Sequence, residues 1–164
     1  MRSDNNFRSL VLMVLLSVTP IFLVQAQNQE FVPEVGQEGK DVVWVPTPQE
    51  LVDTMLAIAE VTASDFVVDL GSGDGRTVIT AAKKGAKAVG IEYNPDMVAL
   101  SIKNAKEQGV SDKAEFIKAD LFEYDLSKAT VITMFLLPDI NLKLRPKILD
   151  LKPGTRIVSN TFTM

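Results

Sequence analysis

Apolar runs alternate with amphipathic segments along the chain from Thr47 onward. Short runs rich in β-branched residues are typical of strands that are buried on both faces of a sheet. Such runs predict five strands, at residues 66–70, 88–92, 115–119, 130–137 and 156–162. Apolar residues three or four positions apart predict four helices, at residues 48–59, 76–84, 94–109 and 140–151. This alternation predicts an α/β fold with a Rossmann-like, doubly wound and mostly parallel sheet.

Several of the expected boundaries carry a local signal. Residues 47–50, T-P-Q-E, have the form of a capping box with proline at the first helical position. Gly85 follows two lysines and is expected to end the second helix, because glycine adopts the left-handed conformation and cations suit the end of the helix dipole. Pro138 is expected to end the fourth strand. Pro146 is expected to split or kink the last helix, because proline cannot donate the helical hydrogen bond.

Residues 66–76, F-V-V-D-L-G-S-G-D-G-R, organise the rest of the chain. A strand begins at Phe66, three glycines follow at alternate positions, and helical periodicity starts at Arg76. Glycine has no Cβ, so the backbone can turn sharply there and approach a ligand closely. A strand, a glycine turn and a helix are how a doubly wound sheet presents backbone N–H groups to a nucleotide. Taken alone, the same turn could serve only to reverse the chain.

Three acidic residues follow three successive predicted strands. Asp69 stands at the end of the first strand, Glu92 ends the second, and Asp120 comes directly after the third. In an open parallel sheet the carboxyl ends of the strands share one crevice, and a carboxylate at the position of Glu92 can bind both hydroxyls of a ribose. Each acid alone is explained as a solvated loop residue or a helix cap. Together they predict a nucleotide-binding site.

These motifs resemble those of the class I S-adenosylmethionine-dependent methyltransferases, from Val42 to the end of the chain. D-L-G-S-G-D-G-R is similar to their first motif, G-I-E-Y-N-P to their ribose-binding acidic motif, and K-A-D-L-F to their adenine-side acidic motif. V-P-T-P, F-L-L-P and G-T-R-I-V-S further resemble a branch with small bacterial methyltransferases and mitochondrial protein-lysine methyltransferases. The alternative is a nicotinamide-dependent oxidoreductase domain, but its G-x-G-x-x-G motif expects glycine where Arg76 stands.

The resemblance implies S-adenosyl-L-methionine as the cofactor. It implies that Glu92 binds the ribose, that Asp120 lies near the adenine, and that Asp69 serves the ammonium of the amino-acid end. The glycine turn would donate backbone N–H groups to the carboxylate of that end. The expected cofactor-binding residues are Thr47, Asp69, Gly71, Gly73, Glu92, Asn94 and Asp120.

The acceptor side carries fewer signals. Many related enzymes that methylate exocyclic amines have an acidic residue or asparagine, two prolines and an aromatic at the end of the fourth strand, whereas this chain has F-L-L-P. The lack of a polar group there argues against a nucleobase, and the resembling branch points to a protein lysine. No catalytic base is identified: Asp139 and Glu123 are candidates by position only, and surface solvation explains both. A cofactor-binding module without catalysis is the alternative function.

Composition narrows the classes of function. The chain has 164 residues, 46% of them hydrophobic, which suffices for one domain with a substantial core. It contains no cysteine or histidine, which excludes disulfides, the usual zinc sites and a histidine base, so we expect no metal. Without the first 26 residues, 15 basic and 20 acidic residues remain, a net charge of −5 that disfavours binding to nucleic acid. No signal predicts the oligomeric state.

Residues 1–26 are typical of a signal peptide. Arg2 and Arg8 precede an apolar run from Leu10 to Val24, and V-Q-A resembles a signal-peptidase site ending at Ala26. The run is short for a spanning helix, so we expect cleavage and export to the periplasm or the exterior. The alternative is an uncleaved segment that anchors the domain to the membrane. Either outcome conflicts with a cofactor that is made inside cells.

The remaining chain divides into two expected parts. Residues 27–40 are polar and acidic, with glycine and proline, and predict a flexible linker. Residues 41–164 form the expected methyltransferase domain. Its only tryptophan, Trp44, is expected to pack on the surface, with a place at the cofactor or substrate entrance as the alternative. The class I fold continues with a helix and a β-hairpin beyond the fifth strand, so we expect a domain that lacks its C-terminal strands.

Overall fold

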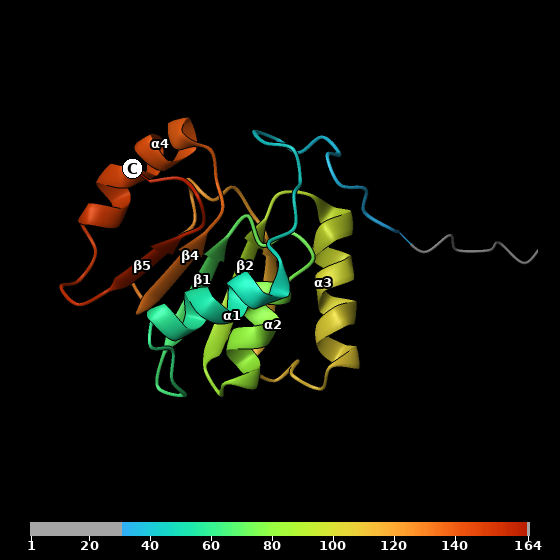
Figure 1. Ribbon diagram of the computed structural model, residues 1–164, viewed down its shortest axis with the longest axis horizontal. Coiled ribbons are helices and arrows are strands. Elements are labelled where there is room, and N and C mark those ends of the chain that lie inside the picture. The colour runs from blue at the N-terminus through green and yellow to red at the C-terminus, as the bar shows by residue number, and fades with distance from the viewer. Residues whose placement is uncertain (1–30, 164) are drawn as a thin grey trace, which may run out of the picture. The chain divides into compact units, whose positions relative to one another are not determined.

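The computed structural model describes residues 31–163. Five parallel strands form one sheet in the order β3-β2-β1-β4-β5, and helices cover both of its faces (Figure 1). The expected signal peptide at residues 1–26 and the start of the expected linker lie outside the described residues. Among the residues described, no helix has the length and apolar character needed to cross a membrane.

Helices and strands follow one another along the chain in the expected order. The strands are β1 (Phe66–Leu70), β2 (Lys87–Glu92), β3 (Ala114–Lys118), β4 (Val131–Met134) and β5 (Arg156–Ser159). The helices are α1 (Gln49–Ile58), α2 (Arg76–Lys83), α3 (Pro95–Glu107) and α4 (Pro138–Leu149). This architecture confirms the predicted α/β, Rossmann-like fold.

The central strand β1 supplies side chains to two separate cores. It pairs with β2 on one side and with β4 on the other, and both Val67 and Val68 are fully buried. Successive side chains of a strand point to opposite faces, so Val67 packs into one core and Val68 into the other. The β-branched pair therefore suits this strand because each residue fills a core of its own.

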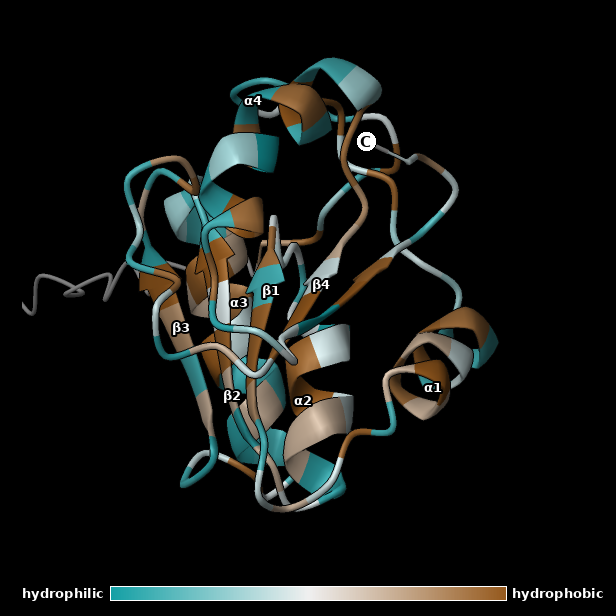
Figure 2. Ribbon diagram, turned by 90° about the vertical axis from the view of Figure 1, so that its left-hand side faces the viewer, coloured by the Kyte–Doolittle hydropathy of each residue, from teal (hydrophilic) through white to brown (hydrophobic). Residues whose placement is uncertain are grey.

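Each core is closed by a different set of helices. On one face, Leu56 of α1, Val78 of α2 and Ala105 of α3 pack against the sheet. On the other face, Ile140 and Leu144 of α4 pack against it together with the segment that follows β3. Figure 2 shows the strands as largely apolar ribbons between helices of mixed character. The sheet is thus doubly wound. The carboxyl ends of its strands form an edge that lies between the layers on its two faces.

The last two strands are shorter than expected. β4 ends at Met134 instead of Leu137, and β5 ends at Ser159 instead of Phe162. Met134 pairs with Leu70, the last residue of β1, so β4 loses its ladder partner where β1 turns away. The three residues that follow leave the sheet and lead into α4, in which Pro138 is the first residue.

Two helix boundaries are confirmed, the expected capping box is wrong, and of the two outcomes expected at Pro146 the split is wrong. Asn94 caps α3 through its side chain, and Gly85 ends α2 with a φ of 96°. The capping box is absent: Pro48 is the N-cap of α1, and no side chain caps that helix. Pro146 does not split α4, which runs through it as one helix. The turn around Leu142 is exposed, so water can bind the carbonyl that proline leaves without a donor.

Candidate functional site

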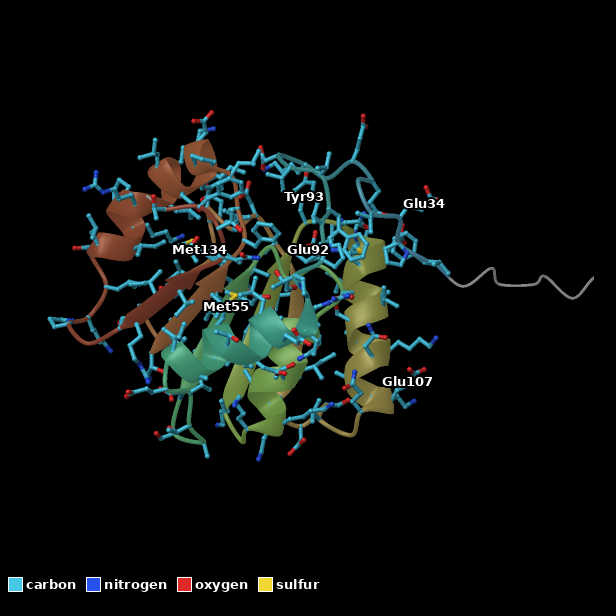
Figure 3. All side chains as sticks on the ribbon, viewed as in Figure 1. Glu34, Met55, Glu92, Tyr93, Glu107 and Met134 are labelled. Carbon is cyan, nitrogen blue, oxygen red and sulfur yellow. The ribbon has the colours of Figure 1, made fainter. Side chains whose placement is uncertain are left out.

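A cavity of about 340 Å³ lies at the carboxyl ends of β1, β2 and β4. This is the crevice that an open α/β sheet offers to a ligand. Asp69, Glu92 and Asp120 all line it, as the sequence led us to expect. In Figure 3, Glu92, Tyr93 and Met134 mark this end of the sheet, whereas Glu107 lies at the far end of α3.

The turn after β1 depends on glycine. Gly71 and Ser72 donate their backbone N–H groups to the carbonyl of Ile91, at 2.9 and 3.1 Å, which fastens the turn to β2. Gly73 has a φ of 54°, and a Cβ there would lie 2.6 Å from the indole nitrogen of Trp44. At Gly75 a Cβ would lie 2.7 Å from the ring of Phe116. A larger residue at Gly73 would displace Trp44, which lines the cavity, whereas one at Gly75 would press against the core.

Glu92 is held by the turn and by the start of α3. One carboxylate oxygen accepts a hydrogen bond from the N–H of Gly73 at 3.0 Å, and the other accepts one from the N–H of Asn94 at 2.9 Å. The side-chain oxygen of Asn94 accepts from the N–H groups of Asp96 and Met97, so this residue acts on its own helix although it lines the cavity. An ionised carboxylate has about four acceptor positions, so Glu92 retains capacity for a ligand.

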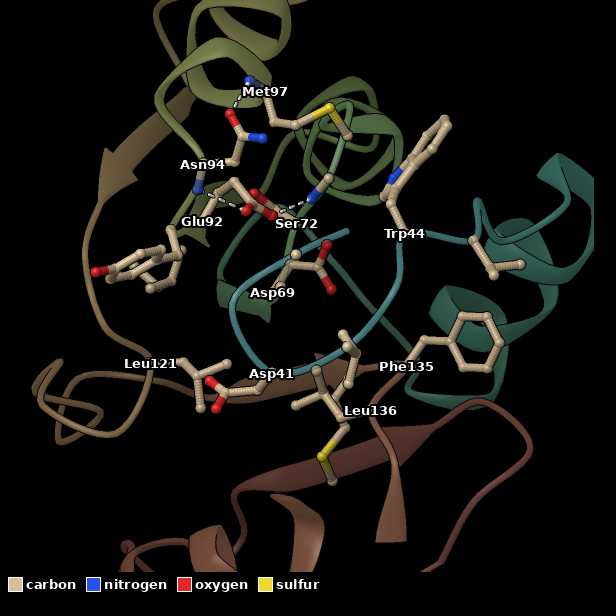
Figure 4. Close-up of a pocket in the computed structure, with 18 of the residues that line it drawn as sticks. Asp41, Trp44, Asp69, Ser72, Glu92, Asn94, Met97, Leu121, Phe135 and Leu136 are labelled. Carbon is tan, nitrogen blue, oxygen red and sulfur yellow. Dashed lines mark hydrogen bonds between the residues drawn. The ribbon is translucent and has the colours of Figure 1, made fainter. Parts of the chain in front are cut away.

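Asp69 is a buried carboxyl group that faces the cavity (Figure 4). The hydroxyl of Thr133, on β4, donates to it at 2.6 Å. Burial raises the pKa of Asp69 to about 7; the hydrogen bond from Thr133 opposes this rise, and the negative charge of Glu92 adds to it. A cation placed in the cavity would favour the ionised form. The position therefore suits the ammonium group of a ligand.

Asp120 is engaged on both of its oxygens. One accepts from the N–H of Phe122 at 2.9 Å, and the other accepts from the ammonium of Lys40 at 2.5 Å. The hydrogen bond from Lys40 is the main cause that lowers the pKa of Asp120, and the pKa of Lys40 is raised in return. Lys40 also stands over the ring of Tyr93, 4.8 Å from its centroid. No local pattern in the sequence points to Lys40, because 80 residues separate it from its partner.

Residues 36–46, here named the strap, lie across the cavity. The strap contains part of the expected linker and also Trp44, and most of its residues line the cavity. The N–H of Gly36 donates to the carbonyl of Trp44 at 2.8 Å, and the N–H of Trp44 donates to the carbonyl of Gln37 at 2.9 Å. Residues 37–40 of the expected linker thus line the site. Trp44 is half-buried and lines the cavity, so its position agrees with the alternative, and its partial exposure also agrees with packing on the surface of the domain.

Thr47 and Arg76 join the strap to the glycine turn. The guanidinium of Arg76 makes two parallel hydrogen bonds to the carboxylate of Asp74 and donates a third to the carbonyl of Thr47, at 2.9 Å. The hydroxyl of Thr47 accepts a long hydrogen bond, 3.5 Å, from the side chain of Asn160. Thr47 lines the cavity as expected, but its backbone makes the shorter contact. In the sequence, Arg76 stands out only because it replaces a glycine of the nicotinamide-binding motif. Its contact with the carbonyl of Thr47 arises in the tertiary structure.

One side of the cavity is apolar. Its lining there includes Phe135 and Leu137 from the β4–α4 connection, Ile140 from α4 and Phe162 from the chain after β5. The rings of Phe135 and Phe162 stack with centroids 6.2 Å apart and planes inclined by 16°. Neither of the positional candidates for a base, Asp139 or Glu123, lines the cavity, and both are exposed.

The residues present suit the methyl donor that the sequence resemblance implies. The buried carboxyl of Asp69 lies in the cavity, and no cationic side chain of residues 31–163 pairs with it, which fits an ammonium group. A Cβ at Gly73 would meet the indole of Trp44, so glycine keeps the turn and the strap close together around the cavity. Glu92 and Asp120 offer acceptors for hydroxyl and amino groups of a nucleoside.

Comparison with known proteins gives a family and several relatives that are named as lysine methyltransferases. The family model of the ANTKMT methyltransferase domain matches residues 69–164. A protein-lysine N-methyltransferase of Saccharolobus islandicus (strain REY15A) is 49% identical over 124 residues, which cover 74% of this chain and 77% of the relative. The adenine nucleotide translocase lysine N-methyltransferase of Mus musculus is 36% identical over 100 residues. That match covers 60% of this chain and only 44% of the mouse protein.

Among solved structures, a protein of Salinibacter ruber is similar in both fold and sequence. It is described as an RNA methyltransferase in complex with S-adenosyl-L-homocysteine. The two chains superpose with a TM-score of 0.68 and 56% sequence identity, over 70% of this chain and 76% of the other. The similarity thus extends over most of the chain that the structure describes.

Proposed function

The chain belongs to the family of ANTKMT methyltransferase domains, and we propose that it transfers a methyl group to the side-chain amine of a protein lysine. Its cofactor is S-adenosylmethionine, the donor whose product occupies the related Salinibacter ruber structure. One observation carries the proposal: carboxylates and apolar side chains line the same cavity, with Glu92 on one side and Phe135 on the other (Figure 4). The first side suits the donor and the second suits the stem of a lysine.

The carboxylate side would hold the donor through three carboxylates. Glu92 would accept from the ribose hydroxyls, and Asp120 would accept from the adenine amino group. Asp69 would pair with the ammonium. The N–H groups of Gly71, Ser72 and Gly73 already donate to Ile91 and Glu92, so the glycine turn would let the carboxylate approach the backbone closely without receiving these three donors, contrary to the expectation from the sequence. Thr47 and Asn94 would support this arrangement through the strap and the start of α3.

The apolar side would prepare the acceptor. The donor supplies a methyl group on a sulfonium: a carbon–nitrogen bond forms, the carbon–sulfur bond breaks with its electron pair left on sulfur, and the nitrogen loses a proton to solvent. The lysine must therefore be neutral when it attacks. Apolar side chains such as Phe135 and Leu137 disfavour its charged form by desolvation. The chain's part in the reaction is to position and to desolvate the amine.

The proposal is tested in two stages. Titration calorimetry with S-adenosylhomocysteine and with NAD comes first, and we expect binding of the former only. The chain is then incubated with donor that carries a deuterated methyl group and with a cell extract, and labelled products are located by mass spectrometry. We expect label on lysine side chains of protein. The Glu92→Ala variant is the control, and its label should fall in parallel with its affinity for S-adenosylhomocysteine.

Two results would count against this function. Binding of NAD without S-adenosylhomocysteine would refute the donor site. Binding of S-adenosylhomocysteine without any labelled product would favour the alternative of a cofactor-binding module that does not catalyse.

RNA methylation is a second candidate, because the Salinibacter ruber protein is described as an RNA methyltransferase. Two features of this chain speak for lysine over a base. The segment F-L-L-P offers no polar side chain to bind an exocyclic amine, and the chain beyond residue 26 carries a net charge of −5. The labelled extract separates the two candidates: label removed by ribonuclease would establish RNA, and label removed by protease would establish protein.

The place of action is part of the proposal. We propose that the domain is exported and that its leader is cleaved after Ala26, supported by the apolar run and the V-Q-A site. Sequencing the N-terminus of the protein from fractionated cells tests this. A protein in the soluble cytoplasm that still begins at Met1 would refute export and would remove the conflict with cofactor supply.

A further inference from the structure

The strap is fastened to the domain at two distant points. At one end, next to α1, the carbonyl of Thr47 accepts from Arg76. At the other end, Lys40 pairs with Asp120, in the loop that follows β3. Between them, Trp44 lies against Gly73 in the turn after β1. The strap therefore crosses the carboxyl ends of β1 and β2, as the blue-to-cyan segment above the sheet in Figure 1 shows.

The strap covers the cavity without filling it. Strap residues and the ends of the strands line the same space, and about 340 Å³ remains between them. A cavity of this size is in the range of small-ligand sites, roughly 300–1,000 Å³. A cofactor in that space would lie against the strap, so movement of the strap would affect its release.

The two fastenings differ in strength. The Thr47 end continues directly into α1, and its partner Arg76 is itself fixed by Asp74. The Lys40 end is attached by one long side chain, whose ion pair with Asp120 and contact with Tyr93 are both partly exposed. Exposed ion pairs are weak and screened by salt, so this end opens more easily.

We propose that Lys40 is a latch that holds the strap over bound S-adenosylmethionine and controls its release. Asp120 can serve the latch and the adenine together, because a carboxylate has about four acceptor positions and two are in use. The latch is a positioning device: Lys40 acts through Asp120 and the strap and does not touch the reacting atoms. The inference rests on the cofactor site of the proposed function and is independent of the acceptor.

Release can be observed with the protein's own fluorophore. Trp44 is the only tryptophan and lines the cavity, so its fluorescence reports on the strap and on the ligand. In a stopped-flow experiment, the protein loaded with S-adenosylhomocysteine is either diluted or mixed with an excess of a competing S-adenosylmethionine analogue. The change in Trp44 fluorescence then gives the dissociation rate. Lys40→Met should speed dissociation by about three- to tenfold, the range of one exposed ion pair with a cation–π contact. Added salt should speed release from the wild type and should leave the variant unchanged.

Lys152→Met is the matched control. Lys152 is an exposed lysine that precedes β5, at the end of the strands opposite the cavity. Its removal changes the net charge equally and should leave the dissociation rate unchanged. In an Asp120→Asn background, Lys40→Met should have a smaller effect than in the wild type, because only the contact of Lys40 with Tyr93 is left to lose.

Hydrogen exchange gives a second readout that does not involve catalysis. The N–H groups of Gly36 and Trp44 bond within the strap, and S-adenosylhomocysteine should protect the peptide that contains them. This protection should be smaller in Lys40→Met. A dissociation rate of Lys40→Met within twofold of the wild type, with equal protection of the strap, would overturn the latch while leaving the cofactor site intact. Failure of the wild type to bind S-adenosylhomocysteine would instead refute the proposed function.

Discussion

Asp69 and Asp120 carry the same functional group in one cavity, yet their surroundings move their pKa values in opposite directions. Asp69 is almost fully buried, and desolvation raises its pKa despite the hydrogen bond from Thr133. Asp120 is partly exposed, and the hydrogen bond from Lys40 is the first cause that lowers its pKa. Asp69 is therefore suited to pair with a cation of a ligand, whereas Asp120 already pairs with Lys40 of the strap.

The first prediction at this scale is a pH dependence of cofactor binding. A ligand ammonium binds the ionised form of Asp69, whose pKa is about 7 in the free protein. The dissociation constant of S-adenosylhomocysteine should thus be lowest above pH 7 and should rise by up to about tenfold per unit as pH falls below it. Titration of Trp44 fluorescence between about pH 5.5 and 8.5 measures this. A dissociation constant that does not change over this interval would show that Asp69 is not the ammonium partner.

In the free protein, the titration of Asp69 should have the opposite effect on stability: its contribution to the free energy of unfolding should fall as pH rises. The folded-state pKa of Asp69 lies above its ordinary value of 3.8, so protonation favours the folded form. Its stabilising contribution is complete below about pH 3.8 and is lost as pH rises through about 7. Asp69→Asn should remove this slope from the pH profile of the free energy of unfolding, which provides a control for the binding experiment.

The second prediction compares two carboxylates. Glu92→Ala should weaken the binding of S-adenosylhomocysteine by about 1.5–3 kcal/mol, since charge-assisted contacts to the ribose are lost. Asp120→Ala should cost less, because the adenine edge offers a single neutral donor. Glu92 also accepts from two backbone N–H groups, so Glu92→Gln serves as the variant of similar shape. Calorimetry measures all three, and an unchanged affinity in a folded Glu92→Ala protein would contradict the placement of the ribose.

At the scale of elements, the turn between β1 and α2 joins parts of the chain that are distant in sequence. Its N–H groups bind the end of β2, Gly73 donates to Glu92, and the hydroxyl of Ser101 on α3 donates to the carbonyl of Gly73 at 2.8 Å. Trp44 of the strap closes the other side. The turn is thus held by three elements, and its shape is a property of their packing.

A comparison of Gly73 with Gly109 distinguishes two effects of a substitution, the strain of a positive φ and a clash with a neighbouring side chain. Gly73 and Gly109 both have positive φ, 54° and 70°, but a Cβ at Gly109 would meet nothing within 4 Å. Gly73→Ala and Gly109→Ala should each lower the free energy of unfolding by about 1 kcal/mol or more, because both force alanine into the left-handed region. Only Gly73→Ala should also weaken the binding of S-adenosylhomocysteine, since it displaces Trp44. Equal affinities of the two variants would show that the turn and the strap do not cooperate.

At the scale of the described domain, the two ends of the sheet do different work. The carboxyl ends of the strands carry the cavity, and the amino ends carry a polar network centred on Asp65. This carboxylate accepts from Thr62 and Thr130 and pairs with Arg156 of β5, which also donates to the carbonyl of Ala59 after α1. Burial alone would raise the pKa of Asp65, but these hydrogen bonds and the charge of Arg156 lower it.

Removal of Arg156 should therefore destabilise the fold without touching the site. Arg156→Met leaves a buried carboxylate with fewer partners, at a cost of about 1–2 kcal/mol, since the arginine itself is partly exposed. Urea denaturation measures this, and the exposed Arg145→Met is the control for loss of charge. The lowered pKa of Asp65 means that its contribution is present above about pH 3.8 and is lost at lower pH, so the difference between variant and wild type should shrink there. A variant as stable as the control at neutral pH would refute this role.

The order of the elements and the gathering of three acids followed from the sequence, because both depend on local patterns. A helix repeats its apolar positions with every turn and a strand with every second residue, so a short segment of sequence suffices to recognise either. Parallel strands necessarily bring their carboxyl ends to one edge of the sheet. The local pattern alone therefore sufficed to place Asp69, Glu92 and Asp120 in one cavity. The ends of β4 and β5 could not be predicted, since each strand ends where its neighbour turns away, as at Leu70.

The strap and its contacts were decided only by the tertiary structure. Residues 36–40 have the composition of a linker, and nothing in their sequence shows that Lys40 reaches a carboxylate 80 positions away. The same holds for Trp44 against Gly73 and for Arg76 on the carbonyl of Thr47. Each is a single long-range contact without a repeating pattern along the chain. Its free energy comes from the position of a partner that the sheet brings near, so the folded domain had to be seen to find it.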